Sequence, residues 1–167
     1  MDSTELTVRS GSRLVTDLTG ELTRYCDGRL FLTTMDSTEL TVRSGARLVT
    51  DLTAELAQFC QDRGDGLVNV FVPHATAGVA LMETGSGSEA DLAGAIDRLL
   101  PAEDIYRHRH GSTGHGRDHV LPAFVSPSVN LPVFDGAPAL GTWQSLVLVD
   151  SNTDNPVRTV RLSFLPG

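Results

Sequence analysis

The sequence contains no lysine, so all of its 13 basic residues are arginines. The absence of lysine excludes Schiff-base enzymes and nucleotide hydrolases with a Walker lysine. Dinucleotide-binding and serine-hydrolase motifs are also absent, so we expect no organic cofactor. No apolar run approaches the length of a membrane span, and the first residues lack the pattern of a signal peptide. We therefore expect a cytoplasmic protein that does not bind membranes.

Positive charge is scarce as well. Aspartate and glutamate number 21 against 13 basic residues, which gives a formal net charge of −8. A surface that binds nucleic acid needs a positive face, so we expect no nucleic-acid partner. Hydrophobic residues make up 40% and charged residues 20% of the chain, a composition typical of globular proteins.

Cysteine is limited to Cys26 and Cys60. Two cysteines cannot provide a four-cysteine zinc site, and a disulfide framework is not expected in a cytoplasmic protein. We expect both to be small buried side chains.

An internal repeat divides the chain. Residues 1–26 and 35–60 are nearly identical. They differ only at Ser12/Ala46, Gly20/Ala54, Thr23/Ala57, Arg24/Gln58 and Tyr25/Phe59. Two copies are too few for a solenoid, and both would require the same place in one core. We interpret 35–167 as the functional domain and 1–34 as a peripheral partial duplicate. A loosely packed extension is the favoured reading of 1–34, and exchange with the same segment of a neighbouring copy is the alternative.

The hydrophobic pattern predicts an α+β fold in which two to three helices pack against a mostly antiparallel sheet. Strands are expected at 38–43, 67–73, 79–83, 129–134, 140–149 and 157–165, and helices at 50–62 with Thr50 as N-cap, 89–100 and 118–125. The first helix should bury Leu52, Leu56 and Phe59, and the second Leu92, Ile96 and Leu99. Residues 103–117 should form a long loop.

Histidines gather in one part of the sequence. Four of the five lie between positions 108 and 119, and His74 ends a predicted buried strand. The four are His108, His110, His115 and His119. Neutral imidazole is a common ligand of transition metals, so this pattern predicts a metal site, with a solvated histidine-rich loop as the alternative. His115 and His119 would share a helical face, although Gly116 weakens a helix there.

Three further features carry alternative interpretations. Glu83, on the same predicted hairpin as His74, suits acid–base chemistry or metal ligation, unless it is simply exposed. Trp143 taken alone is more typical of a core residue, but with Gln144 it can bind a ligand ring. Residues 85–88 favour ordinary helix capping over a phosphate site.

The histidine-containing segments, Glu83 and the segment with Trp143 and Gln144, taken in order, resemble the YjbQ-like family, which is often labelled secondary thiamine-phosphate synthase. The resemblance rests on residues 74–78, Glu83, 106–108, 114–123, 131–133 and 140–144. It implies a compact α+β fold with a β-sandwich-like sheet, assembled as a homotrimer. Met82, Ala75 and the 84–87 loop depart from the family pattern, which has more polar residues there.

The resemblance also implies a site at subunit boundaries with His74, Glu83 and His119 as catalytic residues. A divalent metal, Zn or Mg, would be held by His74 and His119, with His115 as a further candidate. Its partner would be a small phosphorylated or heteroaromatic molecule. The residues expected to bind it are Thr76, Arg117, Trp143 and Gln144.

The implied reaction joins a pyrimidine methyl diphosphate to a thiazole phosphate. Arg117 or a metal would assist the diphosphate, and Trp143 would stack on a heteroaromatic ring. The alternative is a non-catalytic homotrimer that binds a metal or a small anion with the same histidines.

Overall fold

The structure is a computed structural model that describes residues 35–103, 105–108 and 111–167. Residues Met35–Gly167 make up one compact unit. The expectations for residues 1–34, Cys26 and His110 lie outside the described residues. Within the described ranges, no helix is long and apolar enough to cross a membrane.

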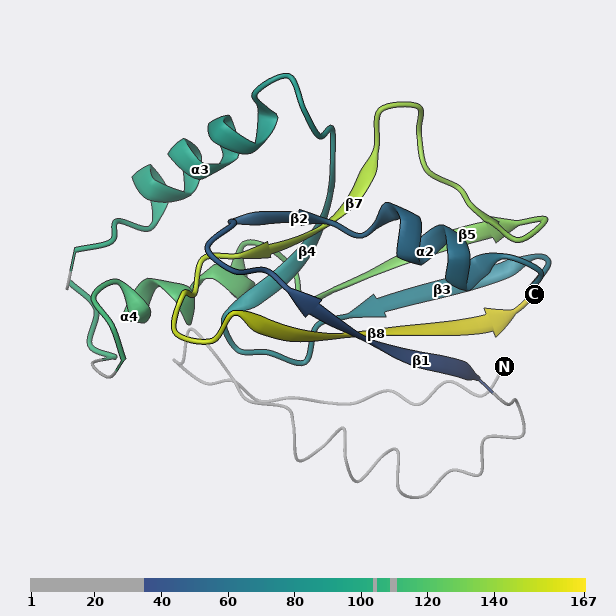
Figure 1. The fold of residues 1–167 in the computed structure, drawn as a ribbon, viewed down its shortest axis with the longest axis horizontal. Helices are drawn as coiled ribbons and strands as arrows, with labels where there is room; N and C mark the ends of the chain where they lie inside the picture. Colours follow the sequence, from purple (N-terminus) through teal and green to yellow (C-terminus); the bar gives the residue numbers. More distant parts are fainter. Residues whose placement is uncertain (1–34, 104, 109–110) are drawn as a thin grey trace, which may run out of the picture. The chain divides into compact units, whose positions relative to one another are not determined.

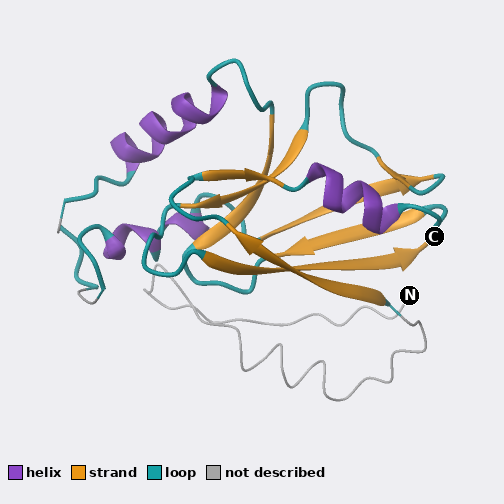
Figure 2. Cartoon of the chain, viewed as in Figure 1, coloured by secondary structure: helices purple, strands orange, loops and turns teal. Residues whose placement is uncertain are grey.

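Two antiparallel sheets form the body of the domain (Figure 1). The larger sheet has the order β1-β8-β3-β5-β6, with β1 Asp36–Arg43, β3 Gly66–Phe71, β5 Ser128–Phe134, β6 Ala137–Pro138 and β8 Val157–Pro166. The smaller sheet has the order β2-β7-β4, with β2 Val49–Asp51, β4 Ala77–Met82 and β7 Ser145–Asp150. In the described part of the chain three α-helices accompany the sheets (Figure 2), so the predicted α+β class is confirmed.

Two of the three described α-helices are shorter than the sequence pattern predicts, whereas the helix predicted at 89–100 has its expected length. They are α2 Thr53–Cys60, α3 Ser88–Leu99 and α4 His115–Asp118, followed by a 3₁₀ turn at Leu121–Ala123. The prediction of Thr50 as N-cap is wrong, because Thr50 pairs with Leu148 in the smaller sheet. Asp51 takes over part of that role, since its Oδ1 accepts the Thr53 N–H at 2.8 Å.

A continuous apolar core fills the space between the sheets and α2. Leu56 and Phe59 share the buried face of α2 as predicted, and Leu52 is buried immediately before the helix. Cys60 is a buried free thiol. A second cluster places α3 against β7 through Ile96 and the β7 valines. Leu99 does not follow the prediction, since it is 56% exposed.

Two expectations about the smaller sheet are wrong. The predicted hairpin joining His74 to Glu83 does not exist, because β3 and β4 belong to different sheets. The predicted strand 140–149 begins only at Ser145, and Trp143 in the preceding loop is 74% exposed. The interpretation of Trp143 as a core residue is therefore wrong.

Candidate functional site

Three of the clustered histidines converge on one point. One ring nitrogen from each of His108, His115 and His119 lies within 4.8 Å of the others. The two Nε2 atoms of His115 and His119 are 3.0 Å apart. The His108 ring centroid lies 4.2 Å from that of His119.

The convergence depends on α4 and on Gly116 within it. The short helix spaces His115 and His119 by about one turn, so their side chains share a face. A Cβ at position 116 would lie 2.6 Å from Tyr106 Cβ and 2.9 Å from the His108 carbonyl oxygen. Only glycine therefore lets α4 approach the loop that carries His108. The residue that weakens the helix in isolation is the one that assembles the cluster.

The donor set of the cluster fits zinc. Tetrahedral zinc with nitrogen bonds of about 2.0–2.1 Å requires nitrogens roughly 3.3 Å apart, close to the observed His115–His119 separation. Three imidazoles suit zinc far better than magnesium, which prefers oxygen ligands. A set of three protein ligands also leaves a fourth coordination position for water or substrate.

The loop after β7 supports His115 from behind. Asp154 Oδ2 lies 2.9 Å from His115 Nδ1, and Asn152 Nδ2 lies 3.2 Å from the same nitrogen. The backbone N–H of Ser112 donates to Asp154 Oδ2 at 3.1 Å and holds the pKa of this carboxyl below its usual value. The His115 side chain is only 11% exposed, so these contacts restrict its orientation.

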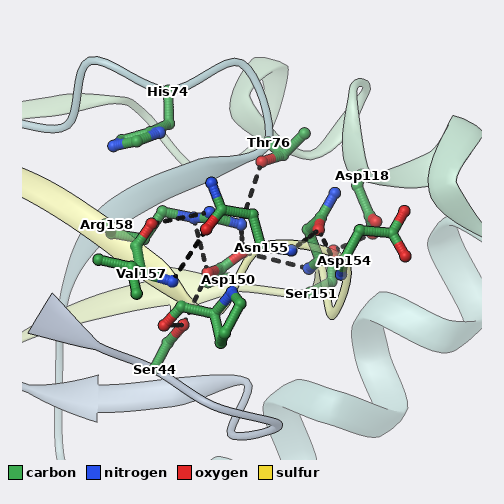
Figure 3. Close-up of polar contacts among 12 residues, drawn as sticks. Ser44, His74, Thr76, Asp118, Asp150, Ser151, Asp154, Asn155, Val157 and Arg158 are labelled. Atoms are coloured by element: carbon green, nitrogen blue, oxygen red, sulfur yellow. Dashed lines mark hydrogen bonds and ion pairs between the residues drawn. The ribbon is translucent and has the colours of Figure 1, made fainter. Parts of the chain in front are cut away.

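A buried ion pair anchors the same loop (Figure 3). Arg158 contacts both carboxylate oxygens of Asp150, with Nε 2.8 Å from Oδ2 and Nη2 3.0 Å from Oδ1. Ser44 Oγ donates to Asp150 Oδ2 at 3.0 Å. Thr76, expected to bind ligand, is buried here with Oγ1 3.5 Å from Arg158 Nη2. The structure thus places Thr76 in this ion-pair network.

His74 lies near the charge of Arg158 and outside the group of three histidines. Its Nε2 accepts the backbone N–H of Thr159 at 2.9 Å, just beyond the point where β3 stops pairing with β8. An accepting Nε2 means that the ring is neutral, with its proton on Nδ1. Burial, and next the nearby charge of Arg158, lowers the pKa of His74, while Asp150 opposes the shift.

We expect His74 to make the protein less stable in mild acid. Its pKa in the folded chain is lowered, so the unfolded chain takes up the proton first as the pH falls below about 6.5. The contribution of His74 is therefore complete above that pH and is progressively lost as the pH falls below it. His74→Gln keeps an acceptor for Thr159 but does not titrate. Urea unfolding between pH 7.5 and 5 should show a steeper loss of stability for the parent chain, and parallel profiles would contradict this assignment.

Arg117 lies on another side of α4, at a small cavity of about 210 Å³. Its Nη1 donates to Asp97 Oδ1 at 2.6 Å and to the Leu100 carbonyl oxygen at 3.3 Å. The cavity is lined by Gly45, Ala46, Leu48, Ala93, Ile96, Asp97, Arg117, Asp150, Ser151 and Thr153. The guanidinium expected to assist a diphosphate is thus already paired with a carboxylate.

Asp118 lies next to this cavity wall. It accepts a 2.5 Å hydrogen bond from Ser151 Oγ, and burial raises its pKa. Sequence reasoning missed Asp118 together with Asp150, Asn152, Asp154 and Arg158. A signal existed for Arg158, which occupies an inward position of the alternating pattern in β8. None existed for Asn152 and Asp154, which lie in a turn.

Glu83, Trp143 and Gln144 lie at the opposite end of the smaller sheet. Met82 pairs with Ser145 at one end of β4 and β7, whereas Ala77 pairs with Asp150 at the other. Five residue steps along a strand span roughly 17 Å. Gln144 Oε1 accepts the Gly141 N–H at 2.8 Å, which shapes the loop that exposes Trp143. Within one chain, these residues therefore lie far from the histidine cluster.

Comparison with known proteins gives a consistent result. The sequence model of the family described as UPF0047 protein YjbQ-like matches residues 38–167. UPF0047 protein Rv2556c of Mycobacterium tuberculosis is 69% identical over 103 residues, which are 62% of this chain and 77% of that protein. UPF0047 protein MJ1081 of Methanocaldococcus jannaschii is 30% identical over 87 residues, which are 52% of this chain and 61% of that protein.

Solved structures share the fold. A YbjQ-like protein of unknown function from Sulfolobus solfataricus superposes with a TM-score of 0.73 at 22% identity, covering 81% of this chain and 99% of that one. Hypothetical protein APE1520 from Aeropyrum pernix K1 gives a TM-score of 0.71 at 29% identity, covering 79% and 99%. With the family match spanning most of the chain, these similarities lead to one conclusion: the chain belongs to the UPF0047, YjbQ-like family.

Proposed function

We propose that this chain is a zinc-dependent enzyme of the thiamine-phosphate synthase type. The observation that carries the proposal is the convergence of His108, His115 and His119, with donor atoms within 4.8 Å of one another. Three nitrogen ligands with an open fourth position are typical of catalytic rather than structural zinc sites.

The reaction class matches the need for a cation. In the condensation, the bond between the pyrimidine methyl carbon and the diphosphate oxygen breaks, and diphosphate leaves with the electron pair. The thiazole ring nitrogen then forms a carbon–nitrogen bond to that methylene. A divalent cation at the cluster would supply stabilisation of the leaving diphosphate. Arg117, the guanidinium expected to assist the diphosphate, is already paired with Asp97.

The proposed enzyme is a homotrimer whose sites are shared between copies. Within one chain, Trp143 and Glu83 lie a strand length away from the histidines. A ring of head-to-tail contacts joins one end of each copy to the other end of the next. Such a ring would bring the exposed Trp143 of one copy to the histidine cluster of its neighbour, where the indole can stack on a heteroaromatic ring.

The second candidate is a non-catalytic homotrimer that binds a metal or a small anion. The exposed position of Glu83, outside the histidine cluster, favours it. The Glu83→Gln variant separates the two functions. A binding protein should keep its affinity for the ligand, whereas an enzyme that uses this carboxyl should lose rate.

Native mass spectrometry combined with a turnover assay tests the proposal. The purified chain should form a trimer that carries about one zinc ion per chain, and a chelator should remove the metal. Turnover of the pyrimidine diphosphate and thiazole phosphate should stop with the chelator and return with zinc. A chain that retains no added zinc would overturn the metal site, and a zinc-loaded trimer without turnover would favour the binding protein.

A further inference from the structure

The turn after β7 places a carboxylate directly behind one of the clustered histidines. Asp154 Oδ2 lies 2.9 Å from His115 Nδ1 and also accepts the Ser112 N–H at 3.1 Å. Ser112 in turn accepts the His115 backbone N–H through its carbonyl oxygen at 3.1 Å. Asp154 therefore binds both the side chain of His115 and the segment that leads into α4.

The contact with Asp154 decides which nitrogen of His115 carries the proton. An ionised carboxylate only accepts hydrogen bonds, so a 2.9 Å contact to Asp154 requires a proton on His115 Nδ1. The Asn152 amide group also lies 3.2 Å from this nitrogen. The Asp154 contact is shorter and charge-assisted, and such hydrogen bonds are about twice as strong as neutral ones. It therefore determines the tautomer.

The orientation of Asn152 is set independently. Its Oδ1 accepts the backbone N–H groups of Asp154 at 2.8 Å and Asn155 at 3.2 Å, so its amide oxygen cannot turn towards His115. Its own N–H donates to Asp150 Oδ1 at 3.1 Å, beside the buried Arg158. Asn152 thus shapes the turn that brings Asp154 to His115.

We infer that Asp154 is a positioning residue for the proposed zinc site, because it holds His115 in the tautomer whose Nε2 is free of a proton. That Nε2 lies 3.0 Å from Nε2 of His119, at the point where the donors converge. This inference rests on the proposed metal-binding function. Carboxylates in this position orient a ligating histidine and raise its basicity.

The backbone closes over the Asp154–His115 pair. A Cβ at Gly111 would lie 2.7 Å from both Asp154 Oδ2 and His115 Cγ. Gly111 also has a φ of +82°, a conformation that favours glycine. Both features indicate that the chain is built to pass closely over this pair.

Zinc affinity and a cobalt spectrum test the role of Asp154. Full-length Asp154→Ala, Asp154→Asn and control Asp91→Asn chains would compete for Zn²⁺ with a chromophoric chelator. Asp91 lies in the first turn of α3 and gives the same change of charge. We expect Asp154→Ala to bind zinc roughly 10–100-fold more weakly, because its histidine loses a fixed tautomer. Asp154→Asn should recover part of the affinity, since its amide oxygen still accepts the Nδ1 proton, and Asp91→Asn should match the parent.

The outcomes separate this inference from the proposed function. Co²⁺ loaded into Asp154→Ala should show an altered visible spectrum, which a purely structural role would not produce. Parent-like zinc affinity and cobalt spectrum in both Asp154 variants would overturn the role of Asp154 while the metal site stands. Failure of the parent chain to bind zinc would overturn the proposed function and this role with it. If Asp154→Ala does not fold, Asp154→Asn carries the test alone.

Discussion

Replacing Arg158 with methionine should lower the free energy of unfolding by about 3–5 kcal/mol, the usual cost of removing one partner from a buried ion pair. Arg158 and Asp150 are 2% and 4% exposed and are joined through both carboxylate oxygens. Without Arg158, the charge of Asp150 remains buried with only neutral donors. Urea unfolding at pH 7 would measure the loss.

Arg161 provides the matched control on the same strand. Its Nη2 lies 2.7 Å from Glu39 Oε1, but the two side chains are 47% and 55% exposed. Exposed pairs contribute about 0–1 kcal/mol, so Arg161→Met should change stability by no more than that. Equal losses for the two variants would mean that the Arg158 pair gains nothing from burial. A double Arg158→Met, Asp150→Leu chain should recover much of the loss, because no uncompensated charge stays inside.

The strands could be predicted because their patterns have a period of two. In β1, Leu40 and Val42 point inward while Thr41 and Arg43 point outward, and the pattern alone locates the strand. The same rule makes Arg158 conspicuous, since it shares the inward face of β8 with Val160 and Leu162. The pattern can show that such a residue is buried, but its partner Asp150 becomes visible only when β7 and β8 are placed together.

Local rules failed where tertiary contacts override them. Thr50 is a good helix cap by residue type, but pairing with β7 draws it into a strand. Gly116 lowers helix propensity, yet the helix forms there because a close approach to Tyr106 and His108 requires a residue without Cβ. Propensity therefore argued against a helix at the position that assembles the histidine cluster.

The candidate site was located only in part. The density of histidines between 108 and 119 predicted a metal centre, but the sequence does not show that His108, and not His74, lies beside His115 and His119. His74 is held away from the cluster by its hydrogen bond to the Thr159 N–H. This contact exists because β8 extends past the last residue of β3 that pairs with it. Asp154 could not be predicted for a similar reason. It lies in a turn, and only folding brings it into contact with His115.

The proposed sharing of sites rests on the smaller sheet, because its two ends carry different candidate residues. One end of β7 reaches the turn that supports His115, and the other end follows the exposed Trp143. Side chains at opposite ends of a strand cannot converge within one rigid sheet. If both ends serve one reaction, each chain must contribute one half of two different sites, which is the arrangement that a head-to-tail ring creates.

Mixing two inactive variants should therefore restore turnover. His119→Ala removes a zinc ligand, and Glu83→Gln alters the opposite end of the sheet, so each homotrimer should be inactive under the proposed function. In trimers reassembled from equal amounts of both, about one site in four pairs an intact histidine cluster with an intact neighbour. We expect recovery of roughly a quarter of parental turnover, measured after unfolding and refolding the mixture.

The control combines two variants of the same end. Mixed His115→Ala and His119→Ala chains carry a damaged histidine cluster in every copy, so no arrangement of subunits yields an intact site. Recovery only in the first mixture requires that residues from two chains meet in one site. Absence of turnover in both mixtures would overturn the shared site and leave the exposed Trp143 without the partner proposed for it. Turnover in the two mixtures therefore tests whether the two ends of the smaller sheet act in one site formed by two chains.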